Sequence, residues 1–126
     1  MSRNAINTEG AAAVGPYSQA VEAAGLIFLS GQTPIDPATR KLANGSIAEQ
    51  TNQCLDNLFA VLKARSLGAD DVISVQVFLT DMNDFPAMNA AYAAKFKQPY
   101  PARTTIGVAS LPLGANVEIA LVARVP

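Results

Sequence analysis

The sequence predicts an α+β domain in which two helices cover one face of a mixed β-sheet. Three observations support this fold class. The chain has 126 residues, of which 50% are hydrophobic, and this suits one domain with a substantial core. Apolar residues alternate in some segments, as in strands, and recur with helical spacing in two others. In chain order these segments predict three strands, a helix, a strand, a second helix and two final strands. We therefore treat residues 1–126 as a single domain.

The predicted strands are short apolar segments bounded by glycine, proline or asparagine. They span residues 3–6, 17–22, 26–30, 72–79, 102–108 and 117–125. Residues 32–45 contain three turn signals and predict a loop. The turn at residues 112–115 predicts that the last two strands form an antiparallel hairpin. Arg103 and Glu118 would then project from the same face of that hairpin.

The first helix is predicted from its start signal. Ser46 and Glu49 have the spacing of a capping box, and the helix should end near residues 66–68. Cys54 lies on its apolar stripe, so we interpret this cysteine as a small core residue rather than a nucleophile. The second helix should be capped by Asn83 or Asp84 and has a proline in its first turn.

One polar residue interrupts the apolar stripe of the second helix. Asn89 lies one turn from both Phe85 and Tyr92. A buried amide costs free energy unless it is hydrogen-bonded. Asn89 is therefore either tied to a nearby backbone group or part of the lining of a pocket.

The sheet face away from the helices should also be partly apolar. Phe78, Val72, Val122 and Ala120 are the residues expected there. An exposed apolar face of this kind is typical of an interaction surface. The sequence therefore predicts oligomerisation.

Composition excludes several classes of function. The net charge is −1 and the sequence pI about 5.2, so no basic surface for nucleic acid is expected. The chain has no histidine and a single cysteine, which argues against a zinc site and excludes an intrachain disulfide. No segment approaches the length of a membrane span, and the N-terminus has no long apolar region. We expect a cytoplasmic protein.

Two charged residues in the C-terminal strands are the first candidates for chemistry. Arg103 is either a solvated or ion-paired strand residue, or an anchor that binds a small carboxylate bidentately. Glu118 is the only acid in the last forty residues, and it either pairs with that arginine or flanks a small-molecule site with it. Ser30 and Gly31 end a strand, where a ligand could approach the backbone closely, although a plain turn glycine explains them equally well.

Four stretches, taken together, identify a resemblance. They are Gly15-Pro-Tyr-Ser-Gln-Ala20, Ser30-Gly-Gln-Thr-Pro-Ile-Asp-Pro37, Asp81-Met-Asn-Asp-Phe85 followed by Met88-Asn89, and Pro101-Ala-Arg103 followed by Val117-Glu-Ile119. In this order and spacing they resemble the Rid family of reactive-intermediate deaminases, also called YjgF-like or endoribonuclease L-PSP proteins. The resemblance covers essentially the whole chain.

The resemblance implies a chorismate-mutase-like fold of the bacillus type, assembled as a homotrimer with a barrel-like core. It implies clefts between subunits that bind a 2-imino acid, such as 2-iminopropanoate or 2-iminobutanoate, and release the 2-oxo acid and ammonia. No cofactor, metal, nucleic acid or membrane is implied.

The resemblance also implies roles for particular residues. Arg103 matches the arginine of the deaminating subfamily that holds the substrate carboxylate, and Glu118 matches the residue that holds the attacking water. Thr105 occupies a pocket position that is cysteine in many bacterial members. This departure argues against thiol-based regulation there and does not by itself remove deamination. The other matched pocket positions are Tyr17, Ser30, Gly31 and Asn89.

Three other functions remain as alternatives. A ribonuclease is disfavoured, because RNA cleavage usually uses paired histidines or a metal and the net charge attracts little phosphate. A non-catalytic trimer could bind a metabolite carboxylate in the same clefts. A pathway-specific deaminase could use the same residues on another enamine or imine.

Overall fold

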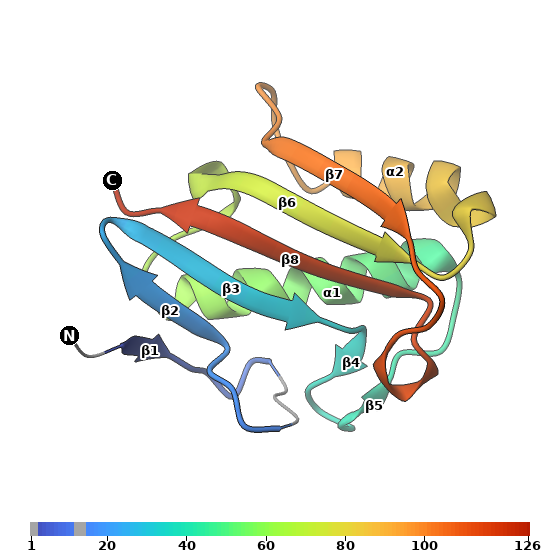
Figure 1. Cartoon of the computed structure of the whole chain (residues 1–126), viewed down its shortest axis with the longest axis horizontal. Coiled ribbons are helices and arrows are strands. Elements are labelled where there is room, and N and C mark those ends of the chain that lie inside the picture. The colour runs from blue at the N-terminus through green and yellow to red at the C-terminus, as the bar shows by residue number, and fades with distance from the viewer. Residues whose placement is uncertain (1–2, 12–14) are drawn as a thin grey trace.

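The computed structural model describes residues 3–11 and 15–126, and its elements follow the predicted order (Figure 1). Two helices, α1 (Ile47–Lys63) and α2 (Phe85–Ala93), alternate with the strands. The strands are β1 (Asn4–Ile6), β2 (Ala20–Ala23), β3 (Leu26–Gln32), β4 (Ile35–Asp36), β5 (Lys41–Leu42), β6 (Val72–Leu79), β7 (Ala102–Gly107) and β8 (Val117–Arg124). Short 3₁₀ helices lie at Ala69–Asp71, Met82–Asp84 and Pro112–Gly114.

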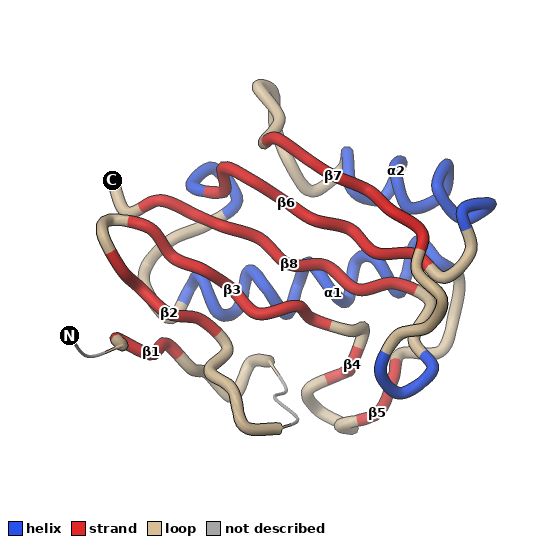
Figure 2. The backbone as a smooth tube through the Cα atoms, in the orientation of Figure 1, coloured by secondary structure: helices blue, strands red, loops and turns tan. Residues whose placement is uncertain are grey.

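One mixed sheet organises the molecule. Its strand order is β1-β2-β3-β8-β6-β7, and only the β6–β7 pair is parallel. Both helices lie on the same face of this sheet, behind it in Figure 1 and Figure 2. The α+β class and the two-helix arrangement are therefore confirmed. Within the described residues, no helix is long and apolar enough to cross a membrane.

The predicted hairpin between the last two strands is wrong. β6 lies between β7 and β8, and it pairs in parallel with β7 and antiparallel with β8. The reason is the connection through α2, because a strand–helix–strand unit normally places its two strands parallel. Residues 108–116 then lead the chain past β6 to its other side.

The new register also places Arg103 and Glu118 on opposite faces. Arg103 pairs with Val75, whose side chain is fully buried under the helices. Glu118 pairs with Phe78, on the face away from the helices. Its neighbours Val117 and Ile119 are fully buried on the helix side, as the alternation of a strand requires. The expectation of one shared face is therefore wrong within a single chain.

The core fills the space between the sheet and the two helices. Its fully buried large side chains are Ile27, Leu55, Leu58, Val61, Val75, Val77, Leu79, Met88, Val117 and Ile119. Val72 belongs to this core with 7% exposure, contrary to its predicted place on the open face. A register shift between Val72 and Ser74 explains the difference, since such an irregularity changes the alternation locally.

The open face of the sheet is partly apolar, as predicted. Phe78, Ala120 and Val122 are half-buried there. Phe28, in β3, pairs with Val122 and is 49% exposed, and Ile106, in β7, pairs with Phe78 and is 45% exposed. The prediction of a partly apolar open face is therefore confirmed, and oligomerisation through it stays a prediction.

The local signals of the first helix are confirmed. The Glu49 amide donates to Ser46 Oγ at 3.2 Å, and the Ser46 amide donates to Glu49 Oε1 at 3.4 Å, which together form the capping box. Cys54 is fully buried against the sheet, and this burial raises the pKa of its thiol, as expected for a core cysteine. The small β4–β5 hairpin lies inside the segment that was predicted as a loop.

Candidate functional site

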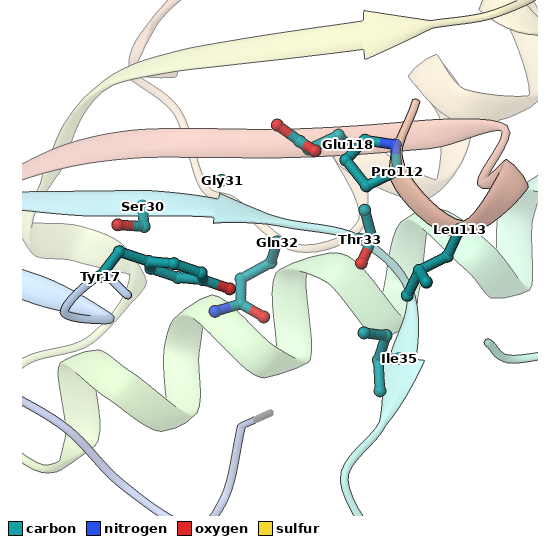
Figure 3. A pocket seen from close by; sticks show the side chains of 9 residues that line it. All are labelled: Tyr17, Ser30, Gly31, Gln32, Thr33, Ile35, Pro112, Leu113 and Glu118. Atoms are coloured by element: carbon teal, nitrogen blue, oxygen red, sulfur yellow. The ribbon is translucent and has the colours of Figure 1, made fainter. Parts of the chain in front are cut away.

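All the predicted site residues except Thr105 are divided between two cavities. The first, which we call the acidic cavity, has a volume of about 380 Å³. It contains four of the predicted residues, namely Tyr17, Ser30, Gly31 and Glu118. Figure 3 shows Tyr17 and Ser30 toward one end, and Leu113 with Ile35 toward the other. The remaining residues that line it are Gln32, Thr33 and Pro112.

The β3–β8 pairing creates the space around Ser30 and Gly31. The register between these strands shifts between Leu29 and Gln32, so the ladder opens at Ser30 and Gly31. The Ser30 hydroxyl donates to the Ser18 carbonyl oxygen at 2.7 Å, which fixes the start of this opening. The Gly31 backbone is therefore accessible from the cavity rather than covered by a regular ladder.

Only glycine fits at position 31 while the Glu118 carboxylate keeps its place. A Cβ atom built on Gly31 would lie 3.0 Å from Cδ of Glu118 and would overlap its Oε2 atom. Contacts this short are essentially never seen for real Cβ atoms. Gly31 therefore lets the carboxylate of Glu118 lie directly against the backbone of β3, and the alternative of a plain turn glycine does not describe it.

The carboxyl group of Glu118 is electrostatically unusual. Partial burial raises its pKa above the ordinary value of 4.5. Among residues 3–11 and 15–126, no group donates a hydrogen bond or forms an ion pair to it. A carboxylate without a partner, with a raised pKa and in a cavity, is a candidate general base.

The second cavity, which we call the cationic cavity, contains Arg103 and Asn89 and has a volume of about 490 Å³. It is lined by Asn89, Tyr92, Ala93, Tyr100, Pro101 and Arg103. Asn89 is exposed, so the expectation of a buried amide on the core stripe is wrong. Met88 and Tyr92 are the buried residues of this short helix, and Asn89 lies at the edge of that stripe. Its amide lines a cavity, which is the second of the two interpretations of this residue.

Arg103 is half-buried, and it forms no ion pair within the described residues. Its guanidinium carbon lies 4.7 Å from the ring centroid of Tyr92 and 5.5 Å from that of Phe85. The ion pairs found in the described part of the chain are Arg65–Glu22 and Lys95–Asp56, and neither includes it. The donors of this half-buried guanidinium are therefore unoccupied by any described residue, which favours the anchor interpretation.

Thr105 follows Arg103 on the same side of β7. It pairs with Val77, a fully buried residue of β6, so its side chain faces the helices. Its Oγ1 atom is buried and makes no hydrogen bond within the described residues. Thr105 lines neither cavity, so the structure does not group it with the other predicted site residues.

Several cavity residues were not predicted. Gln32 is 3% exposed, and its Nε2 atom has no hydrogen-bond partner among the described residues. It follows Ser30 and Gly31 directly, so proximity in sequence could have identified it. Leu113 and the rings that flank Arg103 depend on tertiary packing, and no local pattern identifies them. The described residues contain no cluster of three or more histidine, cysteine, aspartate or glutamate side chains that could hold a metal.

Comparison with protein families gives a match over nearly the whole chain. The model of the family described as endoribonuclease L-PSP matches residues 8–125. A RutC family protein of Pyrococcus horikoshii is 46% identical over 87% of this chain and 87% of its own length. A protein of Mus musculus named 2-iminobutanoate/2-iminopropanoate deaminase is 42% identical over 92% of this chain and 86% of its own length.

Solved structures agree with these relatives. RidA from an Antarctic Psychrobacter bacterium has a TM-score of 0.92 and 40% identity, over 97% of this chain and 99% of that one. TdcF of E. coli, solved with bound serine, has a TM-score of 0.89 and 34% identity, over 96% of this chain and 98% of that one. By its sequence, its fold and the span of the family match, the chain belongs to the Rid family of endoribonuclease L-PSP proteins.

Proposed function

We propose that the protein hydrolyses 2-imino acids, such as 2-iminobutanoate and 2-iminopropanoate, to 2-oxo acids and ammonia at sites formed between two copies of the chain. One observation carries this proposal. Arg103 and Glu118, neither of which forms an ion pair within the described residues, line separate cavities on opposite faces of one sheet. Each cavity holds half of the groups that the reaction needs. Relatives at 42% identity are named for this activity.

A second copy of the chain would bring the two cavities together. The open face of the sheet exposes Phe28 and Ile106 by 45% or more, and burying it would stabilise an assembly. Because the two cavities face different directions, a head-to-tail contact can place one against the other. Repeating that contact in a closed ring of three gives three equivalent sites and a homotrimer.

Arg103 would hold the substrate. Its planar fork matches the two oxygens of a carboxylate, and a bidentate contact fixes both position and orientation. The imine carbon is bonded directly to the carboxylate carbon, so holding the carboxylate also places the reacting atom. Asn89, in the same cavity, offers an amide that can bind the carboxylate or the imine nitrogen.

Glu118 would activate the water. In its ionised form Glu118 accepts a hydrogen bond from a water molecule. It takes up a proton from this water as the water oxygen attacks the carbon of the imine, whose nitrogen is protonated. The product of this step is a tetrahedral carbinolamine. Glu118 then gives this proton to the amine nitrogen and takes up the proton of the carbinolamine hydroxyl as the carbon–nitrogen bond breaks. The carbonyl forms, ammonia leaves, and Glu118 passes its proton to the ammonia, which regenerates the carboxylate. The raised pKa of Glu118 makes it a stronger base than an ordinary carboxylate.

The remaining predicted residues would shape the acidic cavity. Tyr17 and Ser30 lie toward one end of it, where they would limit the size of the substrate. The backbone at Gly31 would lie close to the substrate because it carries no side chain there. Thr105 would contribute its buried hydroxyl only after the assembly or the ligand supplies a partner.

A panel of 2-imino acids tests the proposal. An amino-acid oxidase generates each imine in the presence of semicarbazide, and faster hydrolysis reduces semicarbazone formation. We expect the wild type to accelerate hydrolysis and Arg103→Ala to lose most of this effect. Arg124→Ala is the matched control, because Arg124 is an exposed arginine on another strand of the sheet. Absence of acceleration with every imine would contradict the deaminase function, and full activity of Arg103→Ala would contradict the assigned anchor.

RNA cleavage is not proposed, although the family description names an endoribonuclease. The chain has no histidine and a net charge of −1, so neither the usual catalytic pair nor a basic surface supports that reaction.

A further inference from the structure

We propose that Phe85 and Tyr92 are positioning residues that hold the Arg103 guanidinium between two aromatic faces and leave its N–H edges free for a carboxylate. The inference deepens the proposed function and rests on it for the activity measurements. The sequence predicts both residues only as part of the apolar stripe of the second helix.

The geometry places two aromatic rings on one cation. The guanidinium carbon of Arg103 lies 4.7 Å from the Tyr92 centroid and 5.5 Å from the Phe85 centroid. Both distances fall inside the range of about 6 Å in which cation–π attraction is effective. Phe85 and Tyr92 are seven residues apart on α2, so both rings project from the side of the helix that faces β7. The guanidinium is therefore restrained by one rigid element rather than by a loop.

The Tyr92 ring is itself fixed by its neighbours. Tyr92 is 4% exposed, and its centroid lies 4.8 Å from that of Phe96. Phe96 in turn packs edge-on against Phe59 of α1, with centroids 5.6 Å apart. This aromatic series links the cationic cavity to the core of the domain. A side chain held in this way can restrain Arg103 without rearranging.

An aromatic clamp suits an arginine that must bind an anion. A carboxylate neighbour would also hold Arg103, but it would occupy the donors of the fork and neutralise the charge. A ring contacts the face of the guanidinium and uses none of its N–H groups. Since no described residue forms an ion pair or hydrogen bond with Arg103, its donors are left for a ligand.

The hydroxyl of Tyr92 has no part in this role. Its oxygen is buried and has no hydrogen-bond partner among the described residues. It is also inaccessible to a ligand in the cavity, since its exposed area is below 1 Å². The ring alone should therefore be sufficient, and Phe should replace Tyr at this position without loss.

The test compares Tyr92→Phe, Tyr92→Leu and Phe85→Leu, each made in the wild type and in Arg103→Ala. Activity is followed with 2-iminobutanoate generated in place. We expect Tyr92→Phe to match the wild type, while each Leu variant raises KM by about fivefold to tenfold, as loss of one cation–π contact predicts. The change in kcat should be smaller, because the clamp acts on substrate binding. In Arg103→Ala the same Leu substitutions should change KM less than about twofold, because no guanidinium remains to be positioned.

Phe59→Leu is the matched control. It removes a ring that packs on Phe96 rather than on Arg103, so it should lower stability and change KM far less than Tyr92→Leu and Phe85→Leu do. If Tyr92→Leu and Phe85→Leu have wild-type KM, or raise KM equally with and without Arg103, the clamp is overturned. The clamp is also overturned if Tyr92→Phe raises KM as much as Tyr92→Leu, because the Phe variant keeps the ring.

Binding of 2-oxobutanoate, followed by NMR titration of the same variants, separates this inference from the proposed function. Binding that depends on Arg103 and weakens in both Leu variants supports the clamp, even if the wild type accelerates no imine hydrolysis. Equal dissociation constants in the wild type and the Leu variants overturn the clamp, whatever the activity is. If the wild type neither hydrolyses imines nor binds 2-oxobutanoate, the carboxylate-positioning role is overturned as well.

Discussion

Gly31→Ala should separate catalysis from folding, because the new methyl group would displace one carboxylate and little else. The three atoms nearest to a Cβ at this position are Oε2, Cδ and Cγ of Glu118, and Cδ would lie 3.0 Å away. The Glu118 side chain is flexible at this end, so it can move rather than force the strand apart. To reach ordinary van der Waals contact the carboxylate must shift by roughly 0.5–1 Å. A misplacement of about 1 Å can reduce an enzymatic rate by about 10²-fold, and we expect kcat/KM to fall by roughly that factor.

The assay is hydrolysis of 2-iminobutanoate, measured with the free energy of unfolding from urea titration. Gly68→Ala is the matched control, because a Cβ there meets nothing within 4 Å and the backbone φ is −149°. Gly68→Ala should keep wild-type activity, whereas Gly31→Ala should lose activity and change stability by less than about 1 kcal/mol. Full activity of Gly31→Ala would refute the reasoning that the Glu118 carboxylate must lie against this backbone.

Of three further predictions, two concern Glu118 and one concerns Leu113. Burial raises the pKa of Glu118, so kcat/KM should fall at low pH with an apparent pKa above 4.5, and Glu118→Gln should remove this limb along with most activity. A raised folded-state pKa gives stability that is present below pH 4.5 and lost as the pH rises, so Glu118→Gln should unfold at higher urea than the wild type at pH 7 and not at low pH. A larger stability difference at acidic pH would contradict this sign. Leu113 is 61% exposed and has a φ of 62°, so Leu113→Gly should raise the free energy of unfolding by about 0.5–1 kcal/mol, whereas Leu113→Ala, which keeps the strain, should not. Equal stabilities of the two Leu113 variants in urea titrations would refute the strain argument.

Local signals in the sequence predicted most of the fold. The Ser46 capping box and the strand at residues 72–79 depend on neighbours in the chain, and both appear as expected, except that a register shift moves Val72 into the core. Strand order depends on tertiary topology instead. The insertion of β8 between β3 and β6 could not be deduced from the turn at residues 112–115, and it moved Arg103 and Glu118 to opposite faces.

Only part of the candidate site could be predicted from the sequence, because the rest depends on how the strands pair. Ser30, Gly31 and Glu118 share one cavity as expected, but Gly31 is needed for a contact that arises only when β3 pairs with β8. By sequence, Phe85 and Tyr92 are ordinary core residues of a helix. Helical spacing predicts which face of the helix they occupy, but it does not predict that the Arg103 guanidinium of another strand lies against their rings. Thr105 was assigned by resemblance alone, and the structure leaves it outside both cavities.

The central claim is that Arg103 and Glu118 act together across two copies of the chain, and mixing two variants that each lose most of their activity tests it most directly. Arg103→Ala and Glu118→Gln are purified separately, dissociated together, reassociated at equal amounts and assayed with 2-iminobutanoate. In a closed ring of three, every mixed trimer contains one site with both native residues, so random mixing should restore about a quarter of the wild-type activity. Each variant treated alone should keep only its low residual activity. Reassociated mixtures that remain as inactive as the separate variants, while the wild type regains its activity after the same treatment, would contradict the claim.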